Sequence, residues 1–276
     1  QLKHFRMTGG EPLMDVNTYR VFDYIIENPK PDLHLAITTN LCPDEKLLSK
    51  FFSKLDKISE CKSLSDMTLY VSCDAYGEKA EYIRHGMDYT YLFNNADTFL
   101  KNYTLSSGIT FSISFIATIN LLSITSLRSF IENTVIELRR RHNIDKSWNY
   151  RQRVFFDTPI LHSPAWQSVQ LLPARYREIL REDIKYFKDK VIFEHDSMDN
   201  EGYAQLRDFE VAKLERVLSW MEQGDSLPIE KINRDRADFY KFFNEHDLRR
   251  NTNFLETFPE MEDFWQLCKD AADEQV

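Results

Sequence analysis

Hydrophobic and polar residues alternate over short runs in the first 160 residues. Between these runs lie segments in which apolar residues recur at helical spacing. The alternation predicts strands at 2–7, 34–40, 67–74, 109–117 and 153–157. Apolar residues three and four positions apart predict helices between the strands, such as the one at 43–58. Strands that alternate with helices usually form a parallel sheet, because the chain must cross over between them. The sequence therefore predicts an α/β fold.

The pattern changes near residue 165, where helices begin to dominate. Helical spacing predicts helices at 173–188, 208–223, 234–247 and 257–272. We therefore expect a β/α core over residues 1–165 and a mainly helical extension over residues 166–276. No apolar run approaches the length of a membrane span, and nothing is typical of a signal peptide, so we expect no membrane partner.

Composition narrows the function classes further. The 276 residues are 42% hydrophobic, which is enough for a sizeable core, and the net charge is −9. This charge argues against nucleic acid as the main partner. The four cysteines are dispersed, and no pair has the C-x-x-C spacing of a zinc or redox site. Free cysteines are typical of a reduced compartment, so we expect a cytoplasmic protein.

Polar residues end the predicted strands or follow them closely. In a parallel β/α array the carboxyl ends of the strands meet, and ligands bind there. Each residue alone is more often a cap or a turn residue. Together they predict a polar rim: Glu11, Thr39, Asn40, Ser72, Asp74, Asn120 and Asp157.

The segment from Thr8 to Pro12 has the most distinctive composition. It reads Thr-Gly-Gly-Glu-Pro and lies between a predicted strand and a helix that Asp15 can cap. The glycines allow the backbone to approach a ligand closely, Glu11 supplies a carboxylate, and Pro12 stiffens the turn. An ordinary strand-to-helix turn with a surface glutamate is the alternative.

This segment resembles the Gly-Gly-Glu-Pro motif of the radical S-adenosylmethionine (SAM) superfamily, which meets the amino group of the methionine moiety. Ser72-Cys73-Asp74 and Arg84 resemble a further family pattern, in which Ser72 and Arg84 would hold the SAM carboxylate. Thr39-Asn40 would lie near the ribose, Thr118-Ile119-Asn120 resembles the next strand end, and Leu161 would contact adenine. The resemblance thus assigns cofactor binding to Gly9, Gly10, Glu11, Pro12, Thr39, Asn40, Ser72, Asp74, Arg84 and Asn120.

The C-terminal stretch 245–261 is similar to the same segment of twitch-type radical SAM proteins. From the residues alone, it is a charged turn between two helices. There Asp247, Arg249 and Arg250 would form an ion-pair network, and His246 would be structural. The basic run 139–141 is typical of a helix C-terminus, where cations are favourable.

The resemblance implies a partial (β/α) barrel of parallel strands without its first unit. It also implies a four-iron four-sulfur cluster that, with a low-potential electron donor, cleaves SAM reductively. The products would be methionine and a 5′-deoxyadenosyl radical, and the resemblance favours a peptide or protein substrate.

One part of the family pattern is missing. The cluster is held by three cysteines spaced C-x3-C-x2-C before the Gly-Gly-Glu-Pro segment, and no such spacing occurs here. We expect the cluster ligands to lie upstream, in a longer protein. We therefore assign no catalytic and no metal-binding residue, and we expect this chain alone to be inactive.

Two other readings stay open. One is a degenerate SAM-binding or interaction scaffold without catalysis. The other is an unrelated (β/α) barrel enzyme acting on a sugar or phosphate, which would need an acid–base pair such as Glu11 with Asp74 or Asp157.

Overall fold

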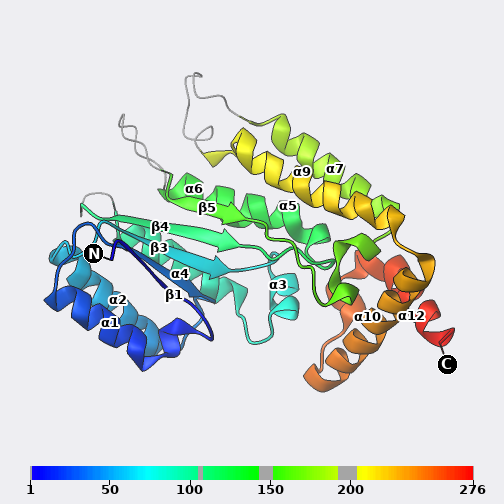
Figure 1. The fold of residues 1–276 in the computed structure, drawn as a ribbon, viewed down its shortest axis with the longest axis horizontal. Helices are drawn as coiled ribbons and strands as arrows, with labels where there is room; N and C mark the ends of the chain where they lie inside the picture. Colours follow the sequence, from blue (N-terminus) through cyan, green and yellow to red (C-terminus); the bar gives the residue numbers. More distant parts are fainter. Residues whose placement is uncertain (1, 105–107, 143–151, 192–203, 276) are drawn as a thin grey trace. The chain divides into compact units, whose positions relative to one another are not determined.

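The strands of the first 157 residues form one parallel β-sheet (Figure 1). The computed structural model describes residues 2–104, 108–142, 152–191 and 204–275. In this part of the chain, five strands pair in chain order, as expected for successive β/α crossovers. The strands are β1 (His4–Met7), β2 (His34–Thr39), β3 (Asp66–Ser72), β4 (Thr110–Ile116) and β5 (Val154–Asp157). The predicted α/β class is confirmed, and the barrel stays a prediction.

The two faces of the sheet differ sharply in polarity. One face is apolar and buried, and it includes Ile37 of β2, Leu69 of β3 and Ile113 of β4, each 0% exposed. Side chains alternate between faces along a strand. The opposite face therefore carries the intervening residues, such as Thr38, Tyr70 and Ser114, which are mostly polar.

Helices cover the apolar face. They are α1 (Val16–Glu27), α2 (Glu45–Glu60), α4 (Tyr89–Asn102) and α6 (Glu137–His142). Aromatic contacts fix this packing, since Phe22 of α1 lies 6.0 Å from Phe51 of α2, and Phe99 of α4 lies 5.9 Å from Phe111 of β4. Asp15 caps α1 through the Asn17 N–H, as predicted.

Two arginines are buried beside this sheet. Arg153 donates to the carbonyls of Phe111 at 2.8 Å and Leu100 at 3.0 Å, and burial lowers its pKa to about 10. Arg139 is 1% exposed and donates to the Val154 carbonyl. The predicted helix end at 139–141 is confirmed, because these residues lie in the last turn of α6, and Arg139 is in addition buried. Its guanidinium satisfies a strand carbonyl, whereas Arg141 pairs with Glu137.

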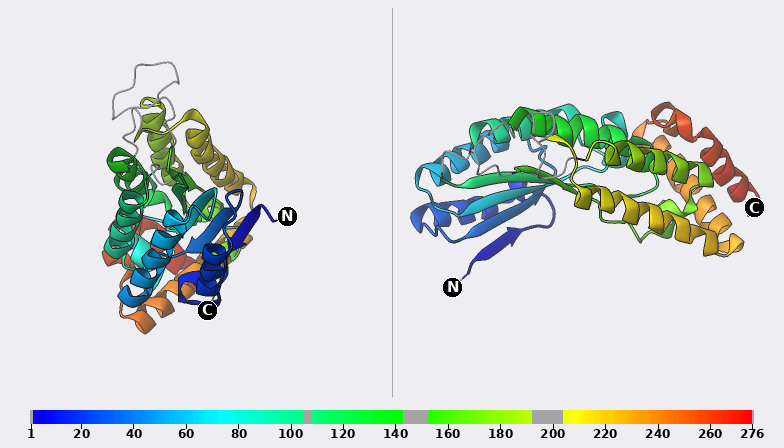
Figure 2. Two further views of the ribbon diagram at one scale, coloured as in Figure 1. Left: turned by 90° about the vertical axis from the view of Figure 1, so that its left-hand side faces the viewer. Right: turned by 90° about the horizontal axis from the view of Figure 1, so that it is seen from above.

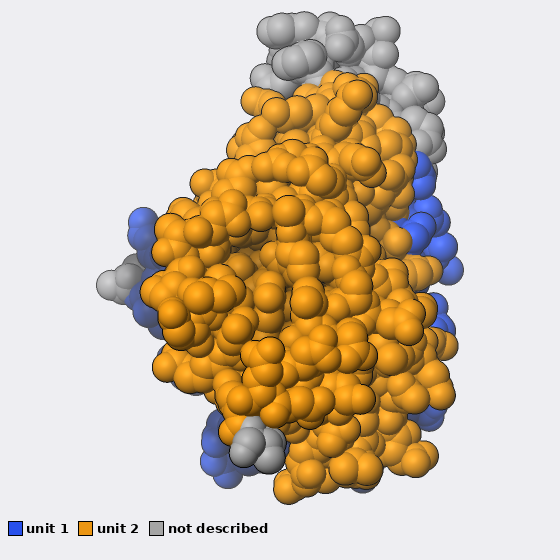
Figure 3. All heavy atoms as spheres, turned by 90° about the vertical axis from the view of Figure 1, so that its right-hand side faces the viewer, with its two compact units in different colours: residues 1–73, 86–116, 133–157 blue, residues 74–85, 117–132, 158–276 orange. Residues whose placement is uncertain are grey.

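The chain divides into two compact units, which Figure 3 distinguishes by colour. Unit 1 comprises residues 1–73, 86–116 and 133–157, and unit 2 comprises residues 74–85, 117–132 and 158–276. Residue 165 lies in unit 2, and the division at this residue stays a prediction. The segments after β3 and β4 belong to unit 2 together with the later helices.

Unit 2 is mainly helical in its described part. It contains α3 (Glu78–Ile83), α5 (Leu127–Phe130), α7 (Ala174–Lys188), α9 (Asp208–Glu222), α10 (Ile229–Arg250), α11 (Phe254–Thr257) and α12 (Glu262–Asp273). Helices α7 and α9 lie side by side (Figure 2). An aromatic core joins α10 to α12, with Phe239 5.2 Å from Phe264.

Some predicted helices have different bounds. The helix expected to run from residue 127 to the basic end is interrupted by a π-helical segment at Ile131–Ile136. The helix expected at 257–272 is two helices, α11 and α12, with a short turn at Pro259–Met261 between them. Pro259 lacks an N–H and cannot continue α11. No helix among the described residues is long and apolar enough to cross a membrane.

Candidate functional site

The Gly-Gly loop (Thr8–Glu11) connects β1 to a 3-10 turn, η1 (Pro12–Met14). Gly9 has φ +94° and Gly10 has φ +55°, a region that side chains with a Cβ rarely adopt. A Cβ at either position would meet no atom within 4 Å. The backbone conformation, rather than lack of space, therefore requires glycine here. The loop lies at the carboxyl end of β1, as predicted.

The Glu11 carboxylate joins this loop to the end of β2. Its Oε1 accepts hydrogen bonds from the Leu13 N–H at 3.0 Å and the Thr39 hydroxyl at 2.6 Å, and its Oε2 accepts from the Asn40 N–H at 2.7 Å. A carboxylate has about four acceptor positions. Glu11 is half-buried, so roughly one position remains for a donor on a ligand.

Thr39 and Asn40 shape the turn after β2. The Thr39 hydroxyl oxygen accepts from the Leu41 N–H at 2.9 Å, and the Asn40 side chain accepts from the Cys42 N–H at 2.9 Å. Leu41 has φ +54°, so the chain turns sharply here. These bonds hold the Thr39 hydroxyl and the Asn40 N–H in place to bind Glu11. Ser72, the last residue of β3, is half-buried in the same unit.

A second polar group lies in unit 2. Arg84 donates to Asp74 from Nε at 2.7 Å and from Nη2 at 3.1 Å, and the Thr118 N–H donates to Asp74 at 2.7 Å. Burial raises the pKa of the Asp74 carboxyl, and the three bonds oppose this rise. Arg84 keeps N–H groups that do not contact Asp74, since a guanidinium carries five.

Asn120 and Asp157 have different surroundings. Asn120 is buried, and it donates to the Thr118 carbonyl at 3.1 Å and accepts from the Leu122 N–H at 3.0 Å. It therefore stabilises the turn after β4. Asp157 is exposed at the end of β5.

The structure thus brings the predicted residues together in two groups. Unit 1 joins Glu11 with Thr39 and Asn40, and unit 2 joins Asp74 with Arg84. A hollow of about 300 Å³ beside the Gly-Gly loop is lined in part by Thr8, Gly9 and Pro12. Because the two groups belong to different units, a single cavity for all of them stays a prediction.

The cysteines do not fit an iron–sulfur cluster. Cys73 and Cys268 are fully buried, Cys61 caps α2, and Cys42 donates to the Asp88 carbonyl at 3.5 Å. Burial raises the pKa of the Cys268 thiol, which disfavours the thiolate that metals bind. Among the described residues, no group of three or more His, Cys, Asp or Glu side chains can hold a metal ion.

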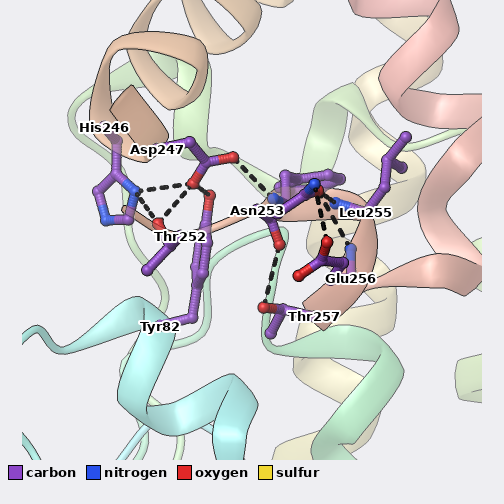
Figure 4. Close-up of polar contacts among 9 residues, drawn as sticks. Tyr82, His246, Asp247, Thr252, Asn253, Leu255, Glu256 and Thr257 are labelled. Atoms are coloured by element: carbon purple, nitrogen blue, oxygen red, sulfur yellow. Dashed lines mark hydrogen bonds and ion pairs between the residues drawn. The ribbon is translucent and has the colours of Figure 1, made fainter. Parts of the chain in front are cut away.

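The C-terminal stretch forms a hydrogen-bonded cluster around Asp247 (Figure 4). Asp247 accepts from the Tyr82 hydroxyl and the Thr252 hydroxyl, each at 2.7 Å, and from the Phe254 N–H at 2.7 Å. The expected ion-pair network takes another form, since Arg249 pairs with Glu245. His246 is buried beside Asp247, and desolvation lowers its pKa. These contacts connect α10 to α3 and to the turn before α11.

Sequence reasoning did not identify two donors of the candidate site. The Leu13 N–H binds Glu11, and the Thr118 N–H binds Asp74. Both are backbone groups, so the type of the residue carries no signal for them. Such donors are identified only by their distance to a carboxylate, and this distance is known only from the three-dimensional structure.

The comparisons with known proteins add no relative. The chain matches no family model, no curated protein and no solved structure.

Proposed function

We propose that this chain is the SAM-binding portion of a radical SAM enzyme, with Glu11 as the acceptor for the SAM ammonium group. One observation supports this assignment above the others. The Glu11 carboxylate is held by three donors from two neighbouring strand ends and keeps about one free acceptor position. An ammonium group needs such an acceptor, and a bond between two charged groups is among the strong ones.

The surroundings of Glu11 favour a fixed orientation. Thr39 and Asn40 are themselves held by bonds in the turn after β2, so their donors do not need to be ordered when a ligand binds. Preorganised groups cost less entropy on binding. The ligand ammonium would therefore meet an acceptor that is already in place.

The second part of the proposal concerns the SAM carboxylate. Arg84 uses two N–H groups for Asp74 and has others for a ligand. A guanidinium matches the planar geometry of a carboxylate, so Arg84 is chemically suited to this role.

We assign no residue of this chain to the binding of the iron–sulfur cluster or of the substrate. The cysteines do not fit a cluster, so we assign the ligands of the cluster to another part of the protein. A peptide or protein substrate, a low-potential electron donor and a barrel-like fold stay part of the proposal.

The dispersed cysteines favour a second candidate, a scaffold that binds SAM without cleaving it. An assay for 5′-deoxyadenosine in the intact protein discriminates between the two, because only the enzyme cleaves SAM.

A calorimetric titration of variants with SAM tests the role of Glu11. The key variant is Glu11→Gln, which removes the charge and places an amide donor where an acceptor is needed. We expect SAM affinity to fall by about tenfold or more, since a bond to a charged group contributes roughly 1.5–3 kcal/mol. The matched control is Glu27→Gln at the exposed end of α1, which should leave the affinity unchanged.

Thr39→Val separates positioning from direct binding. This variant removes one bond to Glu11 but keeps its charge, so it should lower SAM affinity less than Glu11→Gln does. Thermal melting of each variant establishes that it is folded. Equal SAM affinity of folded Glu11→Gln and Glu27→Gln would contradict the assignment.

A further inference from the structure

The polar face of the sheet in unit 1 carries an ordered array of side chains. Three of its residues stand in one register row across β1, β2 and β3: His4, His34 and Asp66. The next row along the same face contains Arg6, Ala36, Thr68 and Ser112. Parallel sheets are normally buried on both faces and apolar on both. A polar face in such a sheet therefore indicates a surface that contacts something other than a packed core.

A hollow of about 420 Å³ lies on this face. Its lining includes His4, Arg6, His34, Asp66, Thr68 and Tyr70. This volume is within the range of small-molecule sites, which is roughly 300–1,000 Å³. The hollow borders residues 4–6 of β1, 34–36 of β2 and 66–70 of β3, and Arg6 also lines the hollow beside the Gly-Gly loop.

Arg6 is the group on this face that is best placed to bind an anion. Its guanidinium lies 4.4 Å from the centre of the Tyr70 ring, and its Nη2 donates to the Thr38 hydroxyl at 3.1 Å. No carboxylate lies within ion-pair distance of Arg6 among the residues that the structure describes. Arg84, in contrast, uses two N–H groups on Asp74. Stacking on Tyr70 fixes the guanidinium plane and leaves its other N–H groups available.

The acidic residue in the hollow does not compete for Arg6. Asp66 is bound by the His34 ring through Nδ1, and the Ser65 hydroxyl lies 3.4 Å from the same carboxylate oxygen. His34 in turn stacks on His4, with ring centres 4.6 Å apart. Asp66 and Arg6 belong to different register rows, two residues apart along the strands, which is about 6.5 Å.

We propose that this face binds a small molecule carrying a carboxylate or a phosphate group, with the anion on Arg6. Tyr70 and Thr38 orient the guanidinium, and the hydroxyl and imidazole groups around the hollow contact the remainder of the ligand. The proposal does not require SAM binding, because the contacts of Arg6 are with Thr38 and Tyr70 and not with Glu11, although Arg6 also lines the hollow beside the Gly-Gly loop.

A titration with two probes tests this site. Inorganic phosphate and succinate are added separately to the ¹⁵N-labelled chain at constant ionic strength, and NMR follows the backbone and side-chain signals. We expect saturable shifts at Arg6, Thr38 and Tyr70 with at least one probe. The probe that binds more tightly identifies the anion class.

Two variants complete the test. Arg6→Gln should weaken binding by about tenfold, as expected for loss of a bond to a charged group. The control Arg20→Gln removes an exposed arginine of α1 that contacts Asn17, and it should leave binding unchanged. Both variants change an exposed side chain, and thermal melting confirms that they are folded. Absence of saturable shifts with both probes, or equal weakening by the two variants, would overturn the proposal.

Discussion

Arg84 donates two hydrogen bonds to Asp74, from Nε to Oδ2 at 2.7 Å and from Nη2 to Oδ1 at 3.1 Å. The Asp74 side chain is 6% exposed, whereas the Arg84 side chain is 32% exposed. The carboxylate is therefore buried while part of the guanidinium reaches solvent. This geometry allows Arg84 to stabilise the fold and to bind a ligand at the same time.

The first prediction concerns the stability of this pair. Arg84→Met leaves a buried carboxylate with only the Thr118 N–H, so we expect the free energy of unfolding to fall by about 3 kcal/mol or more. The double variant Asp74→Asn with Arg84→Met removes the buried charge and should recover much of this loss. Urea unfolding monitored by circular dichroism measures both. Arg249→Met, which breaks the exposed pair with Glu245, is the control and should cost less than about 1 kcal/mol. A double variant no more stable than Arg84→Met would contradict the account.

The second prediction concerns pH and Asp183 on α7. Burial raises the pKa of Asp183 to about 6, with Arg128 opposing the rise and Glu182 adding to it. Between the unfolded pKa, about 4, and the folded pKa, the folded state binds more protons. The contribution of Asp183 to stability is therefore present below this window and is lost as pH rises through it.

Asp183→Asn tests this linkage, because the amide is uncharged at every pH. At pH 7.5 we expect the variant to be more stable by on the order of 2 kcal/mol, and at pH 4 to be nearly equal to the wild type. Thermal melting across this pH range measures the difference. The control Asp189→Asn changes an exposed residue at the end of α7. A stability difference that does not grow between pH 4 and pH 7.5 would refute the assignment.

The third prediction concerns Gly224, after α9. A Cβ at this position would lie 2.4 Å from the Gln170 carbonyl oxygen, closer than real contacts allow. The obstacle is backbone, so we expect Gly224→Ala to lower the free energy of unfolding by about 1–3 kcal/mol. Ser219→Ala on the exposed face of α9 is the control and should be neutral or slightly stabilising. Chemical denaturation of both variants decides the point, and an equally stable Gly224→Ala would show that this contact relaxes at no cost.

Much of the sheet could be predicted, because its signals are local. Alternation in Thr110–Ile116 and helical spacing in α2 each depend on a few neighbouring residues. The division of the chain into two units could not be predicted from the sequence. Residues 74–85 and 117–132 pack with residues that follow 158, and such long-range contacts have no local pattern.

The sequence indicated which residues belong to the candidate site, but it did not indicate their hydrogen-bond partners. The glycines and Glu11 stand out after a strand, so their position could be inferred from the sequence. That Glu11 would be held by Thr39 and Asn40 depends on the pairing of β1 with β2. The burial of Arg139 could not be predicted, because the basic run 139–141 indicates only that a helix ends there.

The measurement that tests the central claim most directly compares two ligands by calorimetry. SAM and its deamino analogue differ only in the amino group, because both retain the sulfonium and the carboxylate. If Glu11 accepts a bond from the ammonium, the wild-type chain should bind SAM about tenfold more tightly than the deamino analogue, and Glu11→Gln should abolish this difference. Equal affinities in the wild type, or a preference that persists in folded Glu11→Gln, would contradict the account.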